Sequence, residues 1–279
     1  MATRIRRPIV AGAFYPRDAG SLQRLADELL GDRSAGGAPL VGPVGLVSPH
    51  AGYPYSGRTA AAGFRSVAEI GTPSTVVVLG ANHTGLGPAV ALDDHDAWET
   101  PLGALRVDRE AIDRLADGGL AVDEAAFARE HSIEVQLPFI QRVWPGSVTI
   151  VPICVQSSAF EALIPAVDGI AALVEDRSAL LLASSDFTHY EPGEIAKRLD
   201  RGALDRILAR NPAGFLEQVR AEGLTICGAG AIAILMAVSD RLGLDQTELI
   251  HYTTSGEVTG DQDSVVGYAS VLFSGGSND

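Results

Sequence analysis

Short runs of branched aliphatic residues alternate along this chain with segments whose apolar positions recur at helical spacing. The runs predict strands at Val44–Ser48, Thr75–Gly80, Val148–Val155, Ala179–Ser184, Glu248–Tyr252 and Val265–Leu272. The helical spacing predicts helices at Ser21–Leu30, Gly57–Ala68, Arg109–Ala116, Glu130–Val143, Phe160–Val174, Pro192–Ala209 and Gly228–Leu242. Strands that are apolar throughout are typical of a parallel sheet covered on both faces. We therefore expect an α/β fold with a mainly parallel central sheet flanked by helices.

The chain is predicted to form a single domain. It has 279 residues, of which 46% are hydrophobic, and this is enough for one large core. No period of 20–50 residues repeats along it, and no linker divides it. We therefore expect one α/β domain over residues 1–279.

Polar residues follow several of the predicted strands at the point where each strand ends. His50 comes two residues after the first strand, and His83 comes shortly after the second. Asp186 and His189 follow the strand Ala179–Ser184. Open α/β sheets bind ligands just outside the carboxyl ends of their strands. These side chains are therefore expected to meet at one site, where imidazole can act as a metal ligand or as a general base.

Cys227 is a further candidate, because it lies where an apolar helical pattern begins. A helix N-terminus lowers the pKa of a thiol, and the thiolate is the species that binds metal or attacks carbon. A small buried hydrophobe is an equally good interpretation of this cysteine and a better one of Cys154, inside a predicted strand. The neighbouring segment Gly228–Ala233 matches a dinucleotide-binding fingerprint, but no acidic residue ends the next strand, so close helix packing explains these small residues better.

Two spacings place further polar side chains together. Asp186 and His189 are three residues apart and would share one face of a helical turn, as metal ligands or as an acid/base pair. His131 and Glu134 have the same spacing at the start of the predicted helix Glu130–Val143, where a capped, exposed helix start is an equally good interpretation. Neither H-E-x-x-H nor H-x-x-E-H is present, which excludes the usual zinc-protease motifs.

The charge balance excludes several classes of function. The formal net charge is −14, whereas nucleic acids and anionic membrane surfaces attract basic proteins. Lys197 is the only lysine among 21 basic residues, and neither a phosphate-binding loop nor a Schiff-base motif surrounds it. We therefore expect no nucleic-acid or membrane partner.

A cytoplasmic location is expected. Two cysteines are too few for a disulfide framework, which fits a reducing compartment. The apolar run Ile9–Phe14 is too short and broken for a signal peptide. The longest apolar stretch, Ala229–Val238, is about half the roughly 20 residues that a membrane helix needs.

Five motifs occur along the chain in this order: Ser48–Tyr53, Leu79–His83, Glu130–Glu134, Ser184–His189 and Ile226–Gly228. Together they resemble those of the Memo family, whose bacterial and archaeal members are called AmmeMemoRadiSam system protein B. The segments Arg7–Pro16 and Trp98–Gly103 match as well, so the resemblance extends from about residue 7 to residue 273. It implies a fold similar to class III extradiol dioxygenases, which hold non-haem iron with two histidines and a carboxylate.

The resemblance also implies roles for single residues. His50, His83 and Cys227 match the metal ligands, with a cysteine where the dioxygenases have a carboxylate. Asp186, His189 and His131 match polar residues that line the family's cleft, and we expect catalytic roles for them. The implied metal is divalent: iron(II) first, with copper or zinc as alternatives. Implied partners are the system's protein A and a radical-SAM protein.

Four functions remain open from the sequence. The first is a metal-dependent, dioxygenase-like oxidoreductase that acts on an unknown small molecule, with His189 or His131 moving protons. The second is a metal-dependent hydrolase with Asp186 or Glu134 as base. The third is a protein that binds a ligand or peptide in the same cleft without turnover. A metal-free thiol enzyme that uses Cys227 is a weaker fourth.

Overall fold

The computed structural model describes residues 3–31, 37–146, 148–175 and 177–276. Its α-helices are α1 (Ala19–Leu30), α2 (Tyr53–Ile70), α3 (Arg109–Asp117), α4 (Leu137–Val143), α5 (Phe160–Val174), α6 (Gly193–Leu208), α7 (Pro212–Glu222), α8 (Ala229–Arg241) and α9 (Ser255–Thr259). Its strands are β1 (Ile5–Arg6), β2 (Val44–Ser48), β3 (Thr75–Ala81), β4 (Val90–Leu92), β5 (Ala97–Thr100), β6 (Gly103–Arg106), β7 (Ala121–Val122), β8 (Thr149–Val155), β9 (Ala179–Ser184), β10 (His189–Glu191), β11 (Gln246–Thr254) and β12 (Val265–Ser274). Two 3₁₀ helices span Glu124–Ala126 and Glu134–Gln136.

The main sheet has a parallel centre and antiparallel flanks. Its strand order is β10-β12-β2-β9-β3-β8-β4-β7, and β11 pairs with β12. The neighbours β2, β9, β3 and β8 run parallel, so their carboxyl ends lie at one edge. Strand β12 runs antiparallel to β2, and β4 runs antiparallel to β8. A small second sheet has the order β1-β5-β6. The predicted α/β class with a mainly parallel centre is confirmed.

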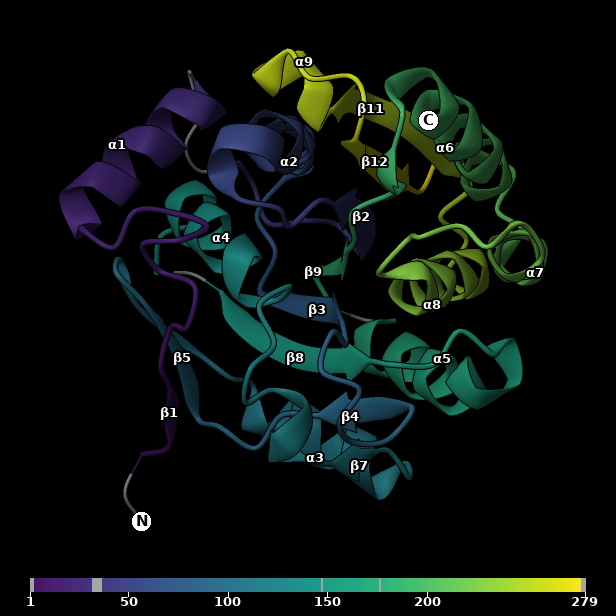
Figure 1. The fold of residues 1–279 in the computed structure, drawn as a ribbon. Coiled ribbons are helices and arrows are strands. Elements are labelled where there is room, and N and C mark those ends of the chain that lie inside the picture. The colour runs from purple at the N-terminus through teal and green to yellow at the C-terminus, as the bar shows by residue number, and fades with distance from the viewer. Residues whose placement is uncertain (1–2, 32–36, 147, 176, 277–279) are drawn as a thin grey trace.

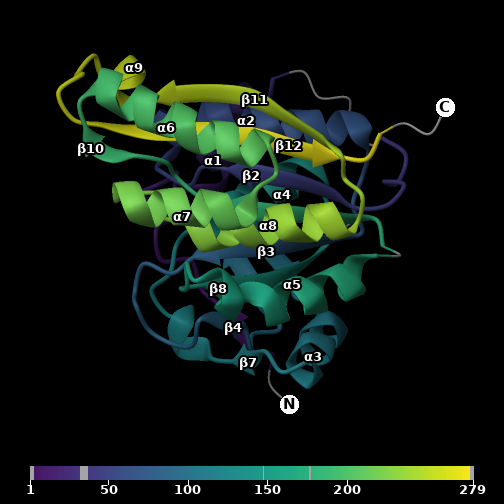
Figure 2. The same cartoon turned by 90° about the vertical axis from the view of Figure 1, so that its right-hand side faces the viewer.

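Helices cover both faces of the main sheet. Helix α2 packs on β2, β11 and β12, and α1 and α4 pack beside it (Figure 1). Helices α5 and α8 cover the other face, with α7 outside α8 and α6 across β11 and β12 (Figure 2). No helix in the described ranges has the length and apolar character that crossing a membrane requires.

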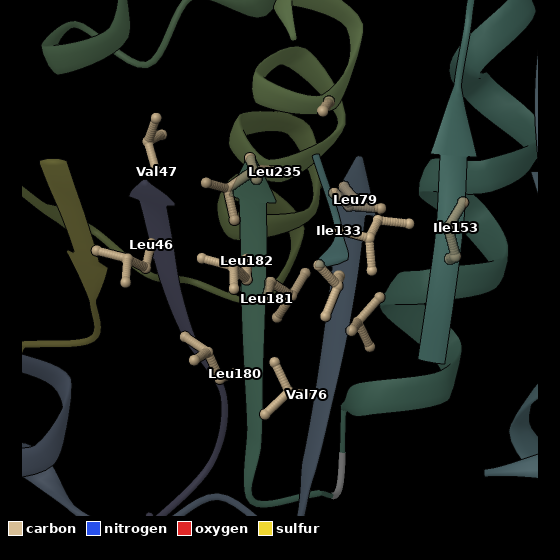
Figure 3. Packing of buried hydrophobic residues seen from close by; sticks show 14 of the residues in the cluster. Leu46, Val47, Val76, Leu79, Ile133, Ile153, Leu180, Leu181, Leu182 and Leu235 are labelled. Carbon is tan, nitrogen blue, oxygen red and sulfur yellow. The ribbon is translucent and has the colours of Figure 1, made fainter. Parts of the chain in front are cut away.

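The central strands are buried on both faces because their residues are apolar throughout. Leu46 of β2, Leu182 of β9 and Leu79 of β3 are fully buried, as is Leu235 of α8 (Figure 3). Every residue of β2, β3 and β9 is buried. This uninterrupted burial explains why the strand predictions were most accurate here.

Glycines at the start of α8 allow the helix to approach the sheet edge closely. A Cβ on Gly230 would lie 2.1 Å from the carbonyl oxygen of Ser157, and one on Gly228 would lie 2.6 Å from that of Ser184. Backbone atoms cannot move aside as a flexible side chain can. Close helix packing therefore accounts for the segment that resembles a dinucleotide fingerprint, as the sequence predicted.

Gly230→Ala is expected to lower the free energy of unfolding by about 1–3 kcal/mol, because the added methyl group overpacks a backbone contact. Denaturant titration against the wild type measures the change. Gly202→Ala in α6 is the matched control, since its Cβ meets only the end of the Gln218 side chain. Alanine in a helix interior should be neutral or stabilising there. Equal stabilities of the two variants would contradict the packing argument.

The helix predicted over Glu130–Val143 is wrong in its first turns. Residues 130–133 are not helical, Glu134–Gln136 is a 3₁₀ turn, and α4 begins only at Leu137. The Glu130 carboxylate accepts the N–H groups of His131 and Ser132, which gives this backbone an alternative to helical bonds. Helix α7 and the short strands β1, β4 to β7 and β10 were not predicted, because their apolar patterns are too short.

Candidate metal centre

The carboxyl edge of the parallel strands brings the predicted polar residues together. His50 follows β2, His83 follows β3, and Asp186 follows β9, which lies between them in the sheet. Cys227 lies just before α8, whose first turn packs against the end of β9. His131 enters from the irregular segment before the Glu134–Gln136 turn.

Three imidazoles lie at the centre of this group. His50, His83 and His131 each offer a ring nitrogen, and these nitrogens all lie within 4.8 Å of one another. The ring centroid of His50 lies 5.2 Å from that of His83 and 5.5 Å from that of His131. The rings of His83 and His131 stack, with their centroids 4.5 Å apart. His50 is buried, whereas the His83 side chain is 33% exposed. The cluster is therefore open on the His83 side.

Hydrogen bonds fix the tautomer of His50. Its Nδ1 lies 3.0 Å from the Ser184 hydroxyl oxygen. That hydroxyl donates its hydrogen to the carbonyl oxygen of Ser132 and accepts a bond from the Gln136 amide. The hydroxyl therefore accepts from His50, which carries its proton on Nδ1 and presents the Nε2 lone pair to the cluster. This arrangement is typical of metal-ligating histidines.

Glu130 orients the imidazole of His83 in a similar way. The His83 Nδ1 lies 3.0 Å from one carboxylate oxygen of Glu130, and the His83 backbone N–H donates to the other. The pKa of Glu130 falls to about 2: burial raises it, but the bonds from His83 and Ser132 outweigh burial. Burial alone would lower the pKa of His83. The hydrogen bond and the charge of the Glu130 carboxylate have a larger effect in the opposite direction, so the pKa of His83 lies above its ordinary value. Glu130 thus directs the Nε2 of His83 toward the other imidazoles.

Burial keeps the other two imidazoles neutral. It lowers the pKa of His50 to about 3 and that of His131 to about 4, and repulsion between the imidazoles adds to the effect. Neutral imidazole is the form that binds metal. Both side chains are therefore ready to act as ligands at neutral pH.

Glu130→Gln is expected to weaken metal binding about 10- to 100-fold at pH 7, the usual effect of losing a residue that orients a ligand. The amide keeps the shape but loses the charge that holds His83. Competition against a chelator of known affinity measures the change. Glu124→Gln, at an exposed carboxylate outside the cluster, is the control and should bind as the wild type does. Unchanged affinity in Glu130→Gln would contradict its role in orienting His83.

Cys227 lies beside His50 and not among the three imidazoles. Its Sγ is 3.4 Å from His50 Nε2, and it accepts the Asp186 backbone N–H at 3.2 Å. The expectation that the helix N-terminus lowers the pKa of this thiol is wrong. Burial and the nearby Asp186 carboxylate raise that pKa well above its ordinary value. Without a metal, Cys227 is a neutral thiol.

Asp186 and His189 flank the cluster in different ways. Asp186 is buried and accepts the backbone N–H of His50, so it holds the turn that carries this imidazole. Burial raises the pKa of Asp186. His189 is half-buried, and its Nδ1 lies 2.8 Å from the carbonyl oxygen of Thr225. The two residues do not share a helical turn, because β10 begins at His189.

The cluster opens into a cavity of about 460 Å³. His50, His83, His131, Asp186 and His189 form its polar wall. Aromatic and small residues form the remainder of its lining: Ala13, Phe14, Ala51, Gly52, Tyr55, Tyr190, Val266 and Tyr268. Its size suits a small-molecule ligand.

Glu134 has no place in this cavity, although the sequence left it open as the base of a metal-dependent hydrolase. It is fully buried and pairs with Arg6 at 2.8 Å. It also accepts the backbone N–H groups of Ile9 and Val10 and the Tyr15 hydroxyl. The orienting roles of Arg6, Glu130 and Ser184 were not predicted, since an orienting hydrogen bond has no signature of its own in one sequence.

The donors present fit a divalent metal. Neutral imidazole nitrogens suit iron, copper and zinc, and a neighbouring thiol favours the softer of these ions. Metal–nitrogen and metal–sulfur bonds of roughly 2.1 and 2.3 Å set two ligands of one ion about 3.5 Å apart. The 3.4 Å between His50 Nε2 and Cys227 Sγ matches this separation.

The fold and the site define an α/β protein with an imidazole-rich cavity at the carboxyl edge of its sheet. The chain belongs to the Memo family, because the model of the Memo-like protein family matches residues 6–272. A MEMO1 family protein of Methanopyrus kandleri is 41% identical, over 96% of this chain and 98% of its own length. One of Thermotoga neapolitana is 39% identical, over 97% of this chain and 100% of its own.

A solved structure supports the fold alone. It is that of an uncharacterized protein from Escherichia coli K12, with a TM-score of 0.53 and 14% sequence identity. The match covers 82% of this chain and 98% of that one.

Proposed function

We propose that this protein is a metal-dependent, dioxygenase-like oxidoreductase that acts on a small molecule. In this proposal His50, His83 and His131 bind one divalent metal, with iron(II) as the physiological ion. The observation that carries the proposal is the convergence of three imidazole nitrogens within 4.8 Å at the wall of a cavity. A bound iron(II) ion would supply one-electron chemistry and open positions for oxygen and substrate.

Cys227 is the third ligand that the sequence predicted, and His131 takes that place in this proposal. The His131 imidazole is neutral at pH 7 because burial lowers its pKa, so it binds without losing a proton. The Cys227 thiol must first lose its proton against a raised pKa. Cys227 lies close enough to His50 to join the same ion as a further ligand.

The carboxylates at the site favour oxidoreduction over hydrolysis. A metallohydrolase needs a carboxylate that is free to take a proton from water. Glu134 is held by Arg6, and Glu130 by four hydrogen bonds from His83, His131 and Ser132. Asp186 lines the cavity, but it is buried, and one of its oxygens accepts the His50 backbone N–H. His189 is half-buried at the cavity wall, and we assign it proton transfer to and from the substrate.

Oxygen uptake tests the proposal. Protein prepared anaerobically with iron(II) and protein loaded with zinc are screened against the same library of small molecules, each with metal-free protein as control. We expect oxygen consumption by the iron form with at least one class of compound, and none by His83→Ala. Hydrolysis by the zinc form, with no oxygen uptake by the iron form, would contradict the proposal.

Metal affinity should depend on pH through His83. The pKa of His50 is about 3 and that of His131 about 4, so above pH 5 neither is protonated. The pKa of His83 is raised by Glu130, so protons compete with metal there first as the pH falls. We expect constant affinity above this pKa and about a tenfold loss per pH unit below it. Zinc titration between pH 5 and pH 8 measures this, and a flat profile would contradict it.

A further inference from the structure

Tyr190 has a backbone conformation that residues with side chains rarely adopt. Its φ is 62°, in the left-handed region, and among described non-glycine residues only Arg210 shares a positive value. His189 and Glu191 pair with the adjacent residues Val266 and Val265 of β12, so Tyr190 is the extra residue of a β-bulge. Bulges near functional sites often redirect one side chain. A glycine would adopt this conformation without strain.

Burial in the core does not explain why a tyrosine occupies position 190 either. Tyr190 is 77% exposed and Tyr55 is 43% exposed. Within the part of the chain that the structure describes, they are the only aromatic residues among the exposed large hydrophobic ones. Both line the cavity at the imidazole cluster, together with Phe14 and Tyr268. In the described ranges, the aromatic side chains of this exposed class thus all line this one cavity.

We infer that Tyr190 and Tyr55 are specificity-determining residues that pack against a flat, unsaturated ring of the ligand. The inference rests on the proposed function, since the polar end of that ligand would face the three imidazoles. Strain, bulge and exposure all occur at Tyr190, next to His189 of the cavity wall, whose ring centroid is 5.8 Å away. A ring that stacks on tyrosine binds more tightly than its buried area alone would predict. This extra contribution raises the expected affinity by up to about tenfold.

Two hydroxamates test this on zinc-loaded protein by titration calorimetry. Acetohydroxamate and benzohydroxamate share the same metal-binding oxygens, and only benzohydroxamate has a ring. The wild type should bind benzohydroxamate at least about tenfold more tightly. Tyr190→Gly should lose about five- to tenfold in benzohydroxamate affinity and keep its acetohydroxamate affinity. Tyr55→Ala should act in the same direction.

Arg210→Gly is the matched control, because it relieves the other left-handed residue outside the cavity and should change neither affinity. Tyr190→Asn is a second variant at the bulge, since asparagine tolerates the left-handed region if glycine loosens the fold. Equal loss of both hydroxamates, or no change in either, would overturn the inference while leaving the metal site intact. If the wild type takes up no zinc, the metal site itself is overturned, and the inference with it; a zinc-loaded wild type that binds neither hydroxamate, or both equally, overturns the inference alone.

Discussion

His83→Ala is expected to weaken metal binding by at least about 100-fold. Structural metal sites with about four ligands have apparent binding free energies of roughly 10–16 kcal/mol, or about 3 kcal/mol for each ligand. His83 presents one of the three converging nitrogens, and Glu130 holds its ring in place. Competition with a chelator, on protein shown by circular dichroism to be folded, measures the loss.

His251→Ala is the matched control for this variant. His251 is an exposed histidine on β11 that bonds Thr59 and takes no part in the cluster. Its removal should leave metal affinity unchanged within about twofold. A similar affinity for the His83→Ala and His251→Ala variants would show that the metal binds elsewhere.

Arg6→Ala is expected to lower the free energy of unfolding by about 3–5 kcal/mol, because it leaves the Glu134 carboxylate buried without its partner. Arg6 is 5% exposed and also bonds the carbonyl oxygens of Phe127 and Glu130. Its guanidinium lies 4.0 Å from the centre of the Trp98 ring. One side chain thus links the N-terminal strand to the segment that carries His131.

Arg7→Ala is the control for this loss of stability. Arg7 also forms an ion pair, with Glu99, but its side chain is 74% exposed, and such pairs contribute at most about 1 kcal/mol. Denaturant unfolding of both variants separates the two cases. If Arg6→Ala and Arg7→Ala lose the same small amount, the buried pair does not stabilise the fold as described.

The sequence predicted the fold best where burial is continuous. The strands Val44–Ser48 and Ala179–Ser184 and the helix Phe160–Val174 match the structure residue for residue, because apolar patterns of that length have few alternatives. Helix α7 was missed, since only Phe215 and Leu216 are buried there. A hydrophobic pattern in the sequence thus predicts elements that have a long apolar face, but not those whose apolar face is short.

The site was predictable where it depends on strand ends. His50 and His83 follow parallel strands, and that alone placed them together. His131 was assigned to a helix start, because the sequence does not reveal that Glu130 bonds the backbone of the next two residues. The role of Glu130 itself depends on contacts between segments far apart in the chain. Such contacts leave no periodic pattern.

The metal content of purified protein tests the central claim, that His50, His83 and His131 together bind one metal ion. Elemental analysis after anaerobic loading with iron(II) and desalting is applied to the wild type, to the three His→Ala variants and to Cys227→Ala. We predict one equivalent in the wild type and in Cys227→Ala, and loss of the metal in each histidine variant. Full retention in His131→Ala with loss in Cys227→Ala would contradict the claim and make the cysteine the third ligand.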